Sequence, residues 1–434
     1  MTVPQIIMLV TLLLMLTGKF PLYLTAFVGS IIAAFMVFPM TGAAIPGPVT
    51  GAAFTVNSLM ISAMHPVILD MMGVLVFIGI MEKAGFLNAI IVRVMQFGER
   101  KGGGPGVCTA GGIAAGIIGG FTGFTQPAIT AVVTGPPAIE LGVDKDKVAG
   151  VIAHAGHLGN FGGITHPTIL TIAATIYTAT NYVIWGWINV IGTIVALSIF
   201  WCSYVRMTRS IKKEHPGAAP VNSGIDKLVA ESGIPFKKAI APFVVLIAGF
   251  LVGIPIAIVG IFSALLVVLM TTRDFFSGEK AMMEGLTRIT VPLFATIGFM
   301  FMSAVIREVG LTAMLTDALG GYIEAYPILI MLIVGSLAGL ITQSNGASIP
   351  IIIPVLTIIL EIPGVHPLTA AVAAAGGPAI MQYYLTGGPV AALATVIPVI
   401  PGSDLKLANR FQRPSILFGM LVLGIITAAL SVIL

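Results

Sequence analysis

Long runs without a charged residue constrain the fold of this chain of 434 residues more than any other feature. Such runs include residues 6–17, 21–40, 183–204, 239–272 and 415–434. About 20 helical residues span a hydrocarbon core about 30 Å thick, and these runs lack the strict alternation of a membrane barrel. We therefore predict an all-α, polytopic integral membrane protein with about 10–14 membrane segments.

The charge content excludes several classes of protein. Only 9% of the residues are charged, whereas a soluble globular chain has roughly 25%. This excludes a soluble enzyme, a nucleic-acid-binding protein and a disordered chain. We predict no enzymatic activity, no cofactor and no metal site, because the nearest metal-like pair, His154 and His157, has no third ligand nearby in sequence. A multi-pass position in the cytoplasmic membrane is expected, and the net charge of +4 indicates no nucleic-acid partner.

A polar stretch at residues 206–238 divides the chain into two similar halves, 1–205 and 239–434. Several short segments recur in the same order: residues 80–86 match 305–311, and residues 119–128 match 338–347. Internal repeats of this kind are typical of secondary transporters, whose substrate sites lie between the repeats near the bilayer midplane. The repeats themselves do not reveal whether the two halves are parallel or inverted.

Each half contains one segment that is unsuited to an unbroken spanning helix, residues 111–137 and residues 335–354. Glycine and proline interrupt both, so we predict breaks at Gln126-Pro127 and at Asn345-Gly346. The N-terminus of a half-helix attracts an anionic group such as a carboxylate, while carbonyl, Ser and Asn oxygens suit Na⁺, here at Ser344 and Asn345. Close helix packing by small residues is the alternative interpretation. The candidate binding residues in these segments are Thr122, Thr125, Gln126, Thr342, Ser344, Asn345 and Ser348.

A second matched pair of segments, residues 153–167 and 375–389, adds polar groups at membrane depth. The candidates here are Asn160, Thr165, His166, Gln382 and Thr386. His166 precedes a proline at a second predicted break and could contact a ligand or carry a proton. The alternative is a buried neutral histidine bonded to a carbonyl, above all for His154 and His157.

The other charged residues are assigned to the membrane surface. Glu82-Lys83 and Arg307-Glu308 each end a predicted helix before a glycine, which favours local ion pairs over contact with substrate. Residues 144–147 are expected to form a hydrophilic loop. The membrane core is therefore expected to be poor in fixed cations, so that helix ends and neutral donors would hold an anion.

These segments resemble the ion transporter superfamily. Ser344-Asn345-Gly346-Ala347-Ser348 is similar to the hairpin-tip motif of its divalent-anion symporters, and Thr125-Gln126-Pro127-Ala128 is similar to the first-half copy. Residues 163–168 are similar to a segment of gluconate permeases. Residues 123–163 are also similar to segments of lactate permeases and of the large membrane subunit of tripartite ATP-independent periplasmic transporters.

The resemblance implies two inverted repeats, each with a re-entrant hairpin and a broken helix, in a homodimer. Residues 1–100 and 239–320 would form a scaffold, and residues 105–180 and 325–400 a mobile transport part that moves as an elevator. The expected function is symport of a small organic carboxylate with H⁺ or Na⁺. Membrane lipid is expected to surround the protein.

Two alternatives remain open. A tripartite transporter subunit would need a small membrane subunit and a periplasmic receptor. A cation/proton antiporter would be expected to place Asp or Glu in the site regions, which contain none.

Overall fold

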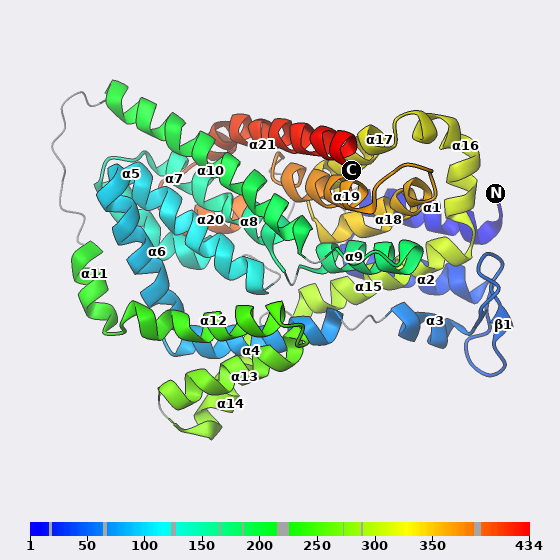
Figure 1. Cartoon of the computed structure of the whole chain (residues 1–434), viewed down its shortest axis with the longest axis horizontal. Helices are drawn as coiled ribbons and strands as arrows, with labels where there is room; N and C mark the ends of the chain where they lie inside the picture. The colour runs from blue at the N-terminus through cyan, green and yellow to red at the C-terminus, as the bar shows by residue number, and fades with distance from the viewer. Residues whose placement is uncertain are drawn as a thin grey trace.

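The computed structural model describes all of the chain except residues 17–19, 64–66, 123–126, 165, 185, 215–224, 272, 288–289 and 386–391. It is almost entirely helical (Figure 1). The first half contains α1 (Val3–Leu16), α2 (Leu22–Phe35), α3 (Val56–Ala63), α4 (Val67–Lys83), α5 (Phe86–Thr122), α6 (Pro127–Glu140), α7 (Lys145–Ala153), α8 (Ala155–Gly162), α9 (Pro167–Thr180) and α10 (Trp187–Glu214). A short antiparallel hairpin of β1 (Ile45–Pro46) and β2 (Ala53–Phe54) lies between α2 and α3.

The second half follows the same general order of elements. It contains α11 (Ile225–Ser232), α12 (Phe236–Leu251), α13 (Ile256–Met270), α14 (Phe275–Thr287), α15 (Thr290–Glu308), α16 (Leu311–Ala325), α17 (Pro327–Thr342), the 3₁₀ turn η1 (Gly346–Ser348), α18 (Ile349–Leu360), α19 (Pro367–Met381), α20 (Ala392–Val396), the 3₁₀ turn η2 (Ile397–Val399) and α21 (Leu405–Ile433). Both α11 and the end of α10 lie inside the polar stretch that divides the halves.

The helices have the length and composition of membrane segments. Within the described residues, Trp187–Ile211 and Leu405–Ile433 are each long and apolar enough to cross a bilayer. Two bent pairs, Met72–Lys83 with Phe86–Gly120 and Ile225–Ser232 with Phe236–Leu251, would raise the number of such spans to four. Six further apolar helices are too short to span alone, as expected where breaks divide a span. The predicted all-α, polytopic fold class is confirmed.

The two halves are intertwined. Helix α2 packs against α15 of the other half, and α13 packs against α4 in the corresponding way. Glycines permit the second contact: a Cβ on Gly73 would lie 2.4 Å from the Cα of Ala257, and a Cβ on Gly260 would lie 2.5 Å from the carbonyl oxygen of Gly73. Such close approach lets helices gain dispersion contacts where lipid offers no hydrophobic driving force.

The buried apolar side chains form three clusters. One flanking cluster joins α1, α2, α3 and α15, and the other joins α4, the start of α5, and α12 to α14. The largest cluster lies between them and is built from the rest of α5 to α10 together with α17 to α21. Helices α10 and α21, which pack against each other, run along this central part (Figure 1).

Glycines in the left-handed region end the helices that precede the central cluster. Gly85 follows α4 with φ +75° and Gly310 follows α15 with φ +77°, so the two halves turn at matching positions as predicted. Helix α5 contains a further break at Gly103, whose φ of 56° and ψ of −140° are non-helical.

One expectation about charged residues needs correction. Residues 144–147 are not a loop, because Asp144 accepts hydrogen bonds from the backbone N–H groups of Asp146 and Lys147 and so begins α7. The Lys83 side chain pairs with Glu284 of α14 at 3.7 Å and therefore also joins two helices.

Candidate functional site

The break between α17 and α18 forms a folded tip. Helix α17 stops where Gln343 adopts the left-handed conformation with φ 49°. The hydroxyl of Thr342 then accepts a hydrogen bond from the backbone N–H of Ser344 at 3.3 Å, and the 3₁₀ turn Gly346–Ser348 leads into α18. Thr342 and Ser344 therefore shape the tip. The predicted break at Asn345-Gly346 is confirmed.

Asn345 is the most connected residue of this tip. Its backbone N–H donates to Gln382 Oε1 at 2.9 Å, and its carbonyl oxygen accepts from Thr168 Oγ1 at 3.0 Å and from Ser348 Oγ at 2.5 Å. Its side-chain Nδ2 donates to the carbonyl oxygen of Asn160 at 3.2 Å. The tip of the second half is thus fixed to the first half by backbone and side-chain bonds.

The Asn345 side chain also carries an unsatisfied oxygen. Asn345 is 2% exposed, and its Oδ1 is buried with no hydrogen-bond partner among the residues that the structure describes. Leaving a buried acceptor unpaired costs about 1–3 kcal/mol, so such an atom calls for a physical explanation. An ion, a water molecule or a solute group at this position would supply one.

The break between α8 and α9 faces this tip. His166 caps α9: its Nδ1 accepts from the backbone N–H of Thr168 at 3.2 Å and lies 3.3 Å from Asn345 Nδ2. A nitrogen that accepts these bonds is unprotonated, so the proton of a neutral ring sits on Nε2. His366 caps α19 in the same way, with Leu368 N at 3.3 Å, which shows that a His-Pro start serves both helices.

Tyr383 is a residue of this cluster that the sequence analysis did not single out. Its hydroxyl accepts from Asn160 Nδ2 at 2.7 Å, and its ring lies edge-on to His157 with centroids 4.5 Å apart. The absence of a Cβ on Gly156 makes room for it, since a Cβ there would lie 1.8 Å from the Tyr383 hydroxyl. The run of glycines around residue 156 is the sequence feature that indicates close packing at this position.

His154 and His157 lie beside this cluster at the kink between α7 and α8. Their ring centroids are 5.3 Å apart. His157 Nδ1 lies 3.4 Å from the carbonyl oxygen of Ala379, while both nitrogens of His154 and Nε2 of His157 are buried without partners. Within the described residues no group of three metal-ligating side chains is present.

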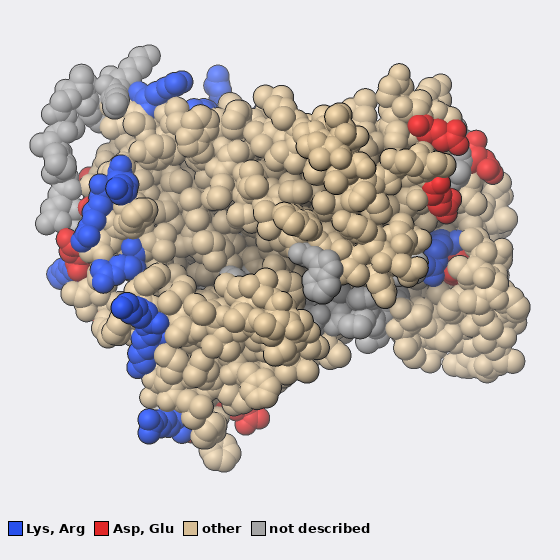
Figure 2. Space-filling view, viewed as in Figure 1, with Lys and Arg blue, Asp and Glu red and all other residues tan. Residues whose placement is uncertain are grey.

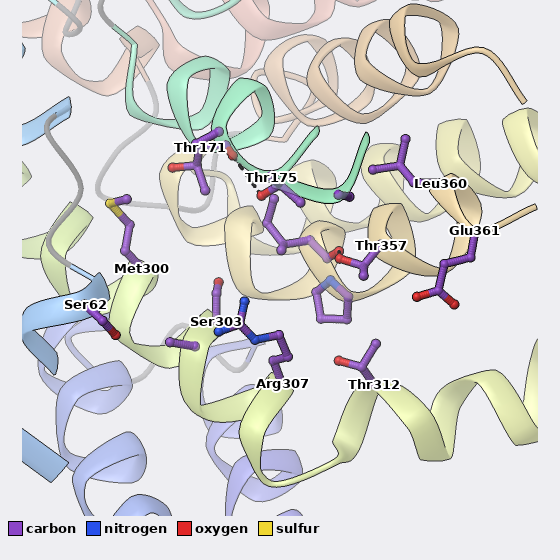
Figure 3. Close-up of a pocket in the computed structure, with 15 residues that line it drawn as sticks. Ser62, Thr171, Thr175, Met300, Ser303, Arg307, Thr312, Thr357, Leu360 and Glu361 are labelled. Carbon is purple, nitrogen blue, oxygen red and sulfur yellow. Dashed lines mark hydrogen bonds between the residues drawn. The ribbon is translucent and has the colours of Figure 1, made fainter. Parts of the chain in front are cut away.

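A cavity of about 410 Å³ lies near this cluster, between α9, α15, α16 and α18 (Figure 3). Its walls carry Thr171 and Thr175 from α9, Ser303 and Arg307 from α15, and Thr357 from α18, with Glu361 at the end of α18. Helix α9 contributes to both the Asn345 tip and the cavity, because Thr168, Thr171 and Thr175 recur at helical spacing along it. None of the predicted binding residues whose side chains the structure describes lines this cavity.

Arg307 forms the predicted local ion pair and also lines the cavity. Its Nε lies 3.1 Å from Glu308 Oε1. Its guanidinium nevertheless lines the cavity, so this part of the protein does hold a fixed cation. Its place in sequence, at a helix end beside an acidic residue, gave no sign of this.

The structure brings five of the predicted residues together. Asn160, His166, Ser348 and Gln382 all surround Asn345. Thr122 ends α5. Four candidates, Thr125, Gln126, Thr165 and Thr386, lie outside the described residues. The predicted break at Gln126-Pro127 also falls at residues outside the description, between α5, which ends at Thr122, and α6, which begins at Pro127.

Comparison with known proteins finds similarity in structure only. No known family profile matches the chain, and no curated protein matches it in sequence. The YdaH transporter of Alcanivorax borkumensis aligns over 98% of this chain and 98% of its own length, with 14% identity and a TM-score of 0.57.

A second solved structure gives the same result. MtrF of Neisseria gonorrhoeae, which is described as illuminating a class of antimetabolite efflux pumps, aligns over 93% of this chain and 94% of its own, with 14% identity and a TM-score of 0.56. These likenesses support a membrane transporter fold but none of the branches that the sequence motifs resemble. The chain thus has the fold of polytopic membrane transporters.

Proposed function

We propose that this protein is a secondary active transporter that moves a small organic carboxylate across the cytoplasmic membrane, coupled to H⁺ or Na⁺. Its fold is that of solved transporters along nearly the whole chain. The observation that carries the proposal is the Asn345 tip, where the break of one half meets the break of the other around a buried oxygen without a partner. Broken helices that meet at membrane depth are where transporters bind their solutes and ions.

The polar groups at the tip suit a coupling ion better than a bulky solute. Asn345 O and Ser348 Oγ lie 2.5 Å apart, and Asn345 also carries the buried Oδ1. Oxygen atoms of this kind are the ligands that Na⁺ takes in broken helices. The neighbouring His166 offers an alternative carrier for H⁺. The larger solute would occupy the cavity along α9, where Arg307 supplies a charge that attracts a carboxylate.

The three apolar clusters support an elevator motion. The central cluster contains apolar side chains of α8, α9, α17 and α19, whose ends form the α8–α9 break and the start of the tip, while the two flanking clusters contain mainly the helices of residues 1–100 and 239–320. Ala347 and Ile349, at the end of the tip, pack in the flanking cluster of α1, α2, α3 and α15. Movement of the central part against the flanks would carry the tip across the bilayer. Membership of the ion transporter superfamily, inverted repeats and a homodimer complete this proposal.

The distribution of charge suggests the orientation. Figure 2 shows Lys and Arg gathered at the end of the molecule where α10 to α12 meet, and Asp and Glu at the opposite end near α16. Basic residues favour the cytoplasmic side, so the cavity beside α16 would open toward the opposite side.

A thermal-stability screen of the purified protein tests the proposal. Monocarboxylates, dicarboxylates and sugar acids are compared at two pH values, with and without Na⁺, because a ligand that binds the folded state raises its stability. Compounds that stabilise the protein are then assayed for uptake and efflux in liposomes. Transport only after addition of a small membrane subunit and a receptor would identify a tripartite system, and transport of cations alone would identify an antiporter.

A further inference from the structure

The cavity between α9, α15, α16 and α18 presents charges of both signs. Arg307 and Glu361 both line it, and Figure 3 shows Thr312 and Thr357 between them. The ion-pair partner of Arg307 is Glu308, not Glu361. Within the described part of the chain Glu361 has no ion pair, so its carboxylate is available to a cationic group.

The hydroxyl groups of the cavity are oriented as acceptors. Four of the lining hydroxyls each donate their hydrogen to a backbone carbonyl four residues earlier in the same helix. The four bonds are Thr171 to Pro167 at 2.8 Å, Thr175 to Thr171 at 2.9 Å, Ser303 to Phe299 at 3.0 Å and Thr357 to Ile353 at 3.0 Å. A hydroxyl whose hydrogen is engaged offers only lone pairs to a ligand, and lone pairs bind N–H donors or cations.

The local charge disfavours a simple anion. Arg307 already faces one carboxylate in Glu308, and Glu361 adds a second. A solute with only a carboxylate would add a third negative charge at an end of the molecule where acidic side chains already gather (Figure 2). A solute that also carries an ammonium group adds no net charge and supplies three N–H donors to the acceptor oxygens.

We propose that this cavity binds a zwitterionic amino acid, with its carboxylate on Arg307 and its ammonium group beside Glu361 and the hydroxyl oxygen of Thr357. This rests on the proposed function and narrows it, because it assigns the transported carboxylate to the class of amino carboxylates. The volume of about 410 Å³ is at the lower end of the range for small-molecule sites.

A binding panel tests this directly. Amino acids whose ammonium group lies one to five carbons from the carboxylate, from glycine to 6-aminohexanoate, are each compared with the fatty acid and the alkyl amine of the same chain. Binding to purified wild-type protein is measured as a ligand-dependent shift in unfolding temperature, with choline chloride replacing NaCl in a parallel series. At least one amino acid is expected to bind about tenfold more tightly than both matched compounds, because each of these lacks one charged contact.

Two variants test whether the amino acid raises the unfolding temperature by binding in this cavity and not elsewhere on the protein. Glu361→Gln removes the exposed acceptor charge and is expected to weaken amino acid binding about tenfold, while fatty-acid binding becomes tighter because one negative charge is removed. Glu279→Gln makes the same change on the exposed surface of α14, outside the cavity, and should bind the amino acid as wild type does.

The outcomes separate this inference from the proposed function. Carboxylates that bind equally well without an ammonium group would overturn the inference and leave the transporter proposal standing. Equal shifts with Na⁺ alone, or equal weakening by both variants, would also overturn it. Amino acids that bind as expected but are not moved by the reconstituted protein would support the site and contradict the transport function.

Discussion

Asn345 donates its side-chain amide to the backbone carbonyl of Asn160 at 3.2 Å, joining two helix breaks that lie 185 positions apart in sequence. The same amide lies 3.3 Å from His166 Nδ1. One side chain thus offers donors to two acceptors of the other half, and its own oxygen is left without a partner. This relationship makes the effects of substitutions at the tip predictable.

Asn345→Asp is expected to lower the unfolding temperature more than Asn345→Ala. Alanine removes both contacts of the amide group, to the Asn160 carbonyl and to His166 Nδ1, together with the unpaired oxygen, so its net effect is about 1–2 kcal/mol. Aspartate has no N–H group and would place a buried carboxylate beside the Asn160 carbonyl, which adds repulsion and desolvation. Thermal unfolding in detergent measures both. An aspartate variant as stable as wild type would show that the amide does not bridge the halves.

His154 and His166 are expected to respond oppositely to replacement by phenylalanine. Both ring nitrogens of His154 are buried without partners, and Phe200 lies edge-on at 6.0 Å, so His154→Phe should leave stability unchanged or raise it by about 1 kcal/mol. His166→Phe removes the cap of α9 and should cost about 1–2 kcal/mol. Equal losses in the two variants would contradict these assignments.

Gly339→Ala is expected to force α17 away from α19. A Cβ there would lie 2.5 Å from the Cα of Pro378, a backbone atom that cannot turn aside, and overpacking of this kind costs about 1–3 kcal/mol. Gly424→Ala is the matched control in α21, where a Cβ meets nothing within 4 Å and helix propensity favours alanine. The difference between their unfolding temperatures is the measurement, and a control that is the less stable of the two would refute the packing argument.

Glu308 is expected to hold the β1–β2 hairpin. This fully buried carboxylate accepts from Thr50 Oγ1 at 2.9 Å and from Arg307 Nε at 3.1 Å. Glu308→Ala should therefore speed protease cleavage within residues 39–55 and lower stability by more than Thr50→Val, which removes one bond worth about 1 kcal/mol. Limited proteolysis of both variants tests this, and identical cleavage rates in wild type and Glu308→Ala would exclude the role.

The sequence predicts much of the local structure. Glycine has the same backbone freedom in any surroundings, so the breaks at Gly85 and Gly310 follow from residue identity alone. The break near Asn345-Gly346 is predicted in place, but the residue in the left-handed conformation there is Gln343 and not the glycine. The start of α9 at His166-Pro167 can likewise be predicted from the proline. The role of His166 as a helix cap cannot be predicted, because capping depends on the rotamer that brings Nδ1 to the Thr168 N–H.

Long-range packing accounts for what the sequence does not predict. A repeat in sequence says nothing about which half supplies the neighbour of a helix, so the exchange of α2 and α13 between halves is visible only in the structure. Tyr383 follows the candidate Gln382 in sequence and Arg307 precedes Glu308, but only the fold brings Tyr383 to Asn160 and Arg307 to the cavity. The orientation of the Thr171 and Thr175 hydroxyls likewise depends on coordinates.

The most direct test of the central claim is the initial rate of solute uptake by purified protein in liposomes, compared between wild type, Asn345→Ala and Gly424→Ala at equal protein content. Loss of contacts to a bound ion or solute should lower the rate of Asn345→Ala by about tenfold or more, while Gly424→Ala transports as wild type does. Uptake by Asn345→Ala at the wild-type rate would contradict the claim that the meeting point of the two breaks is the transport site.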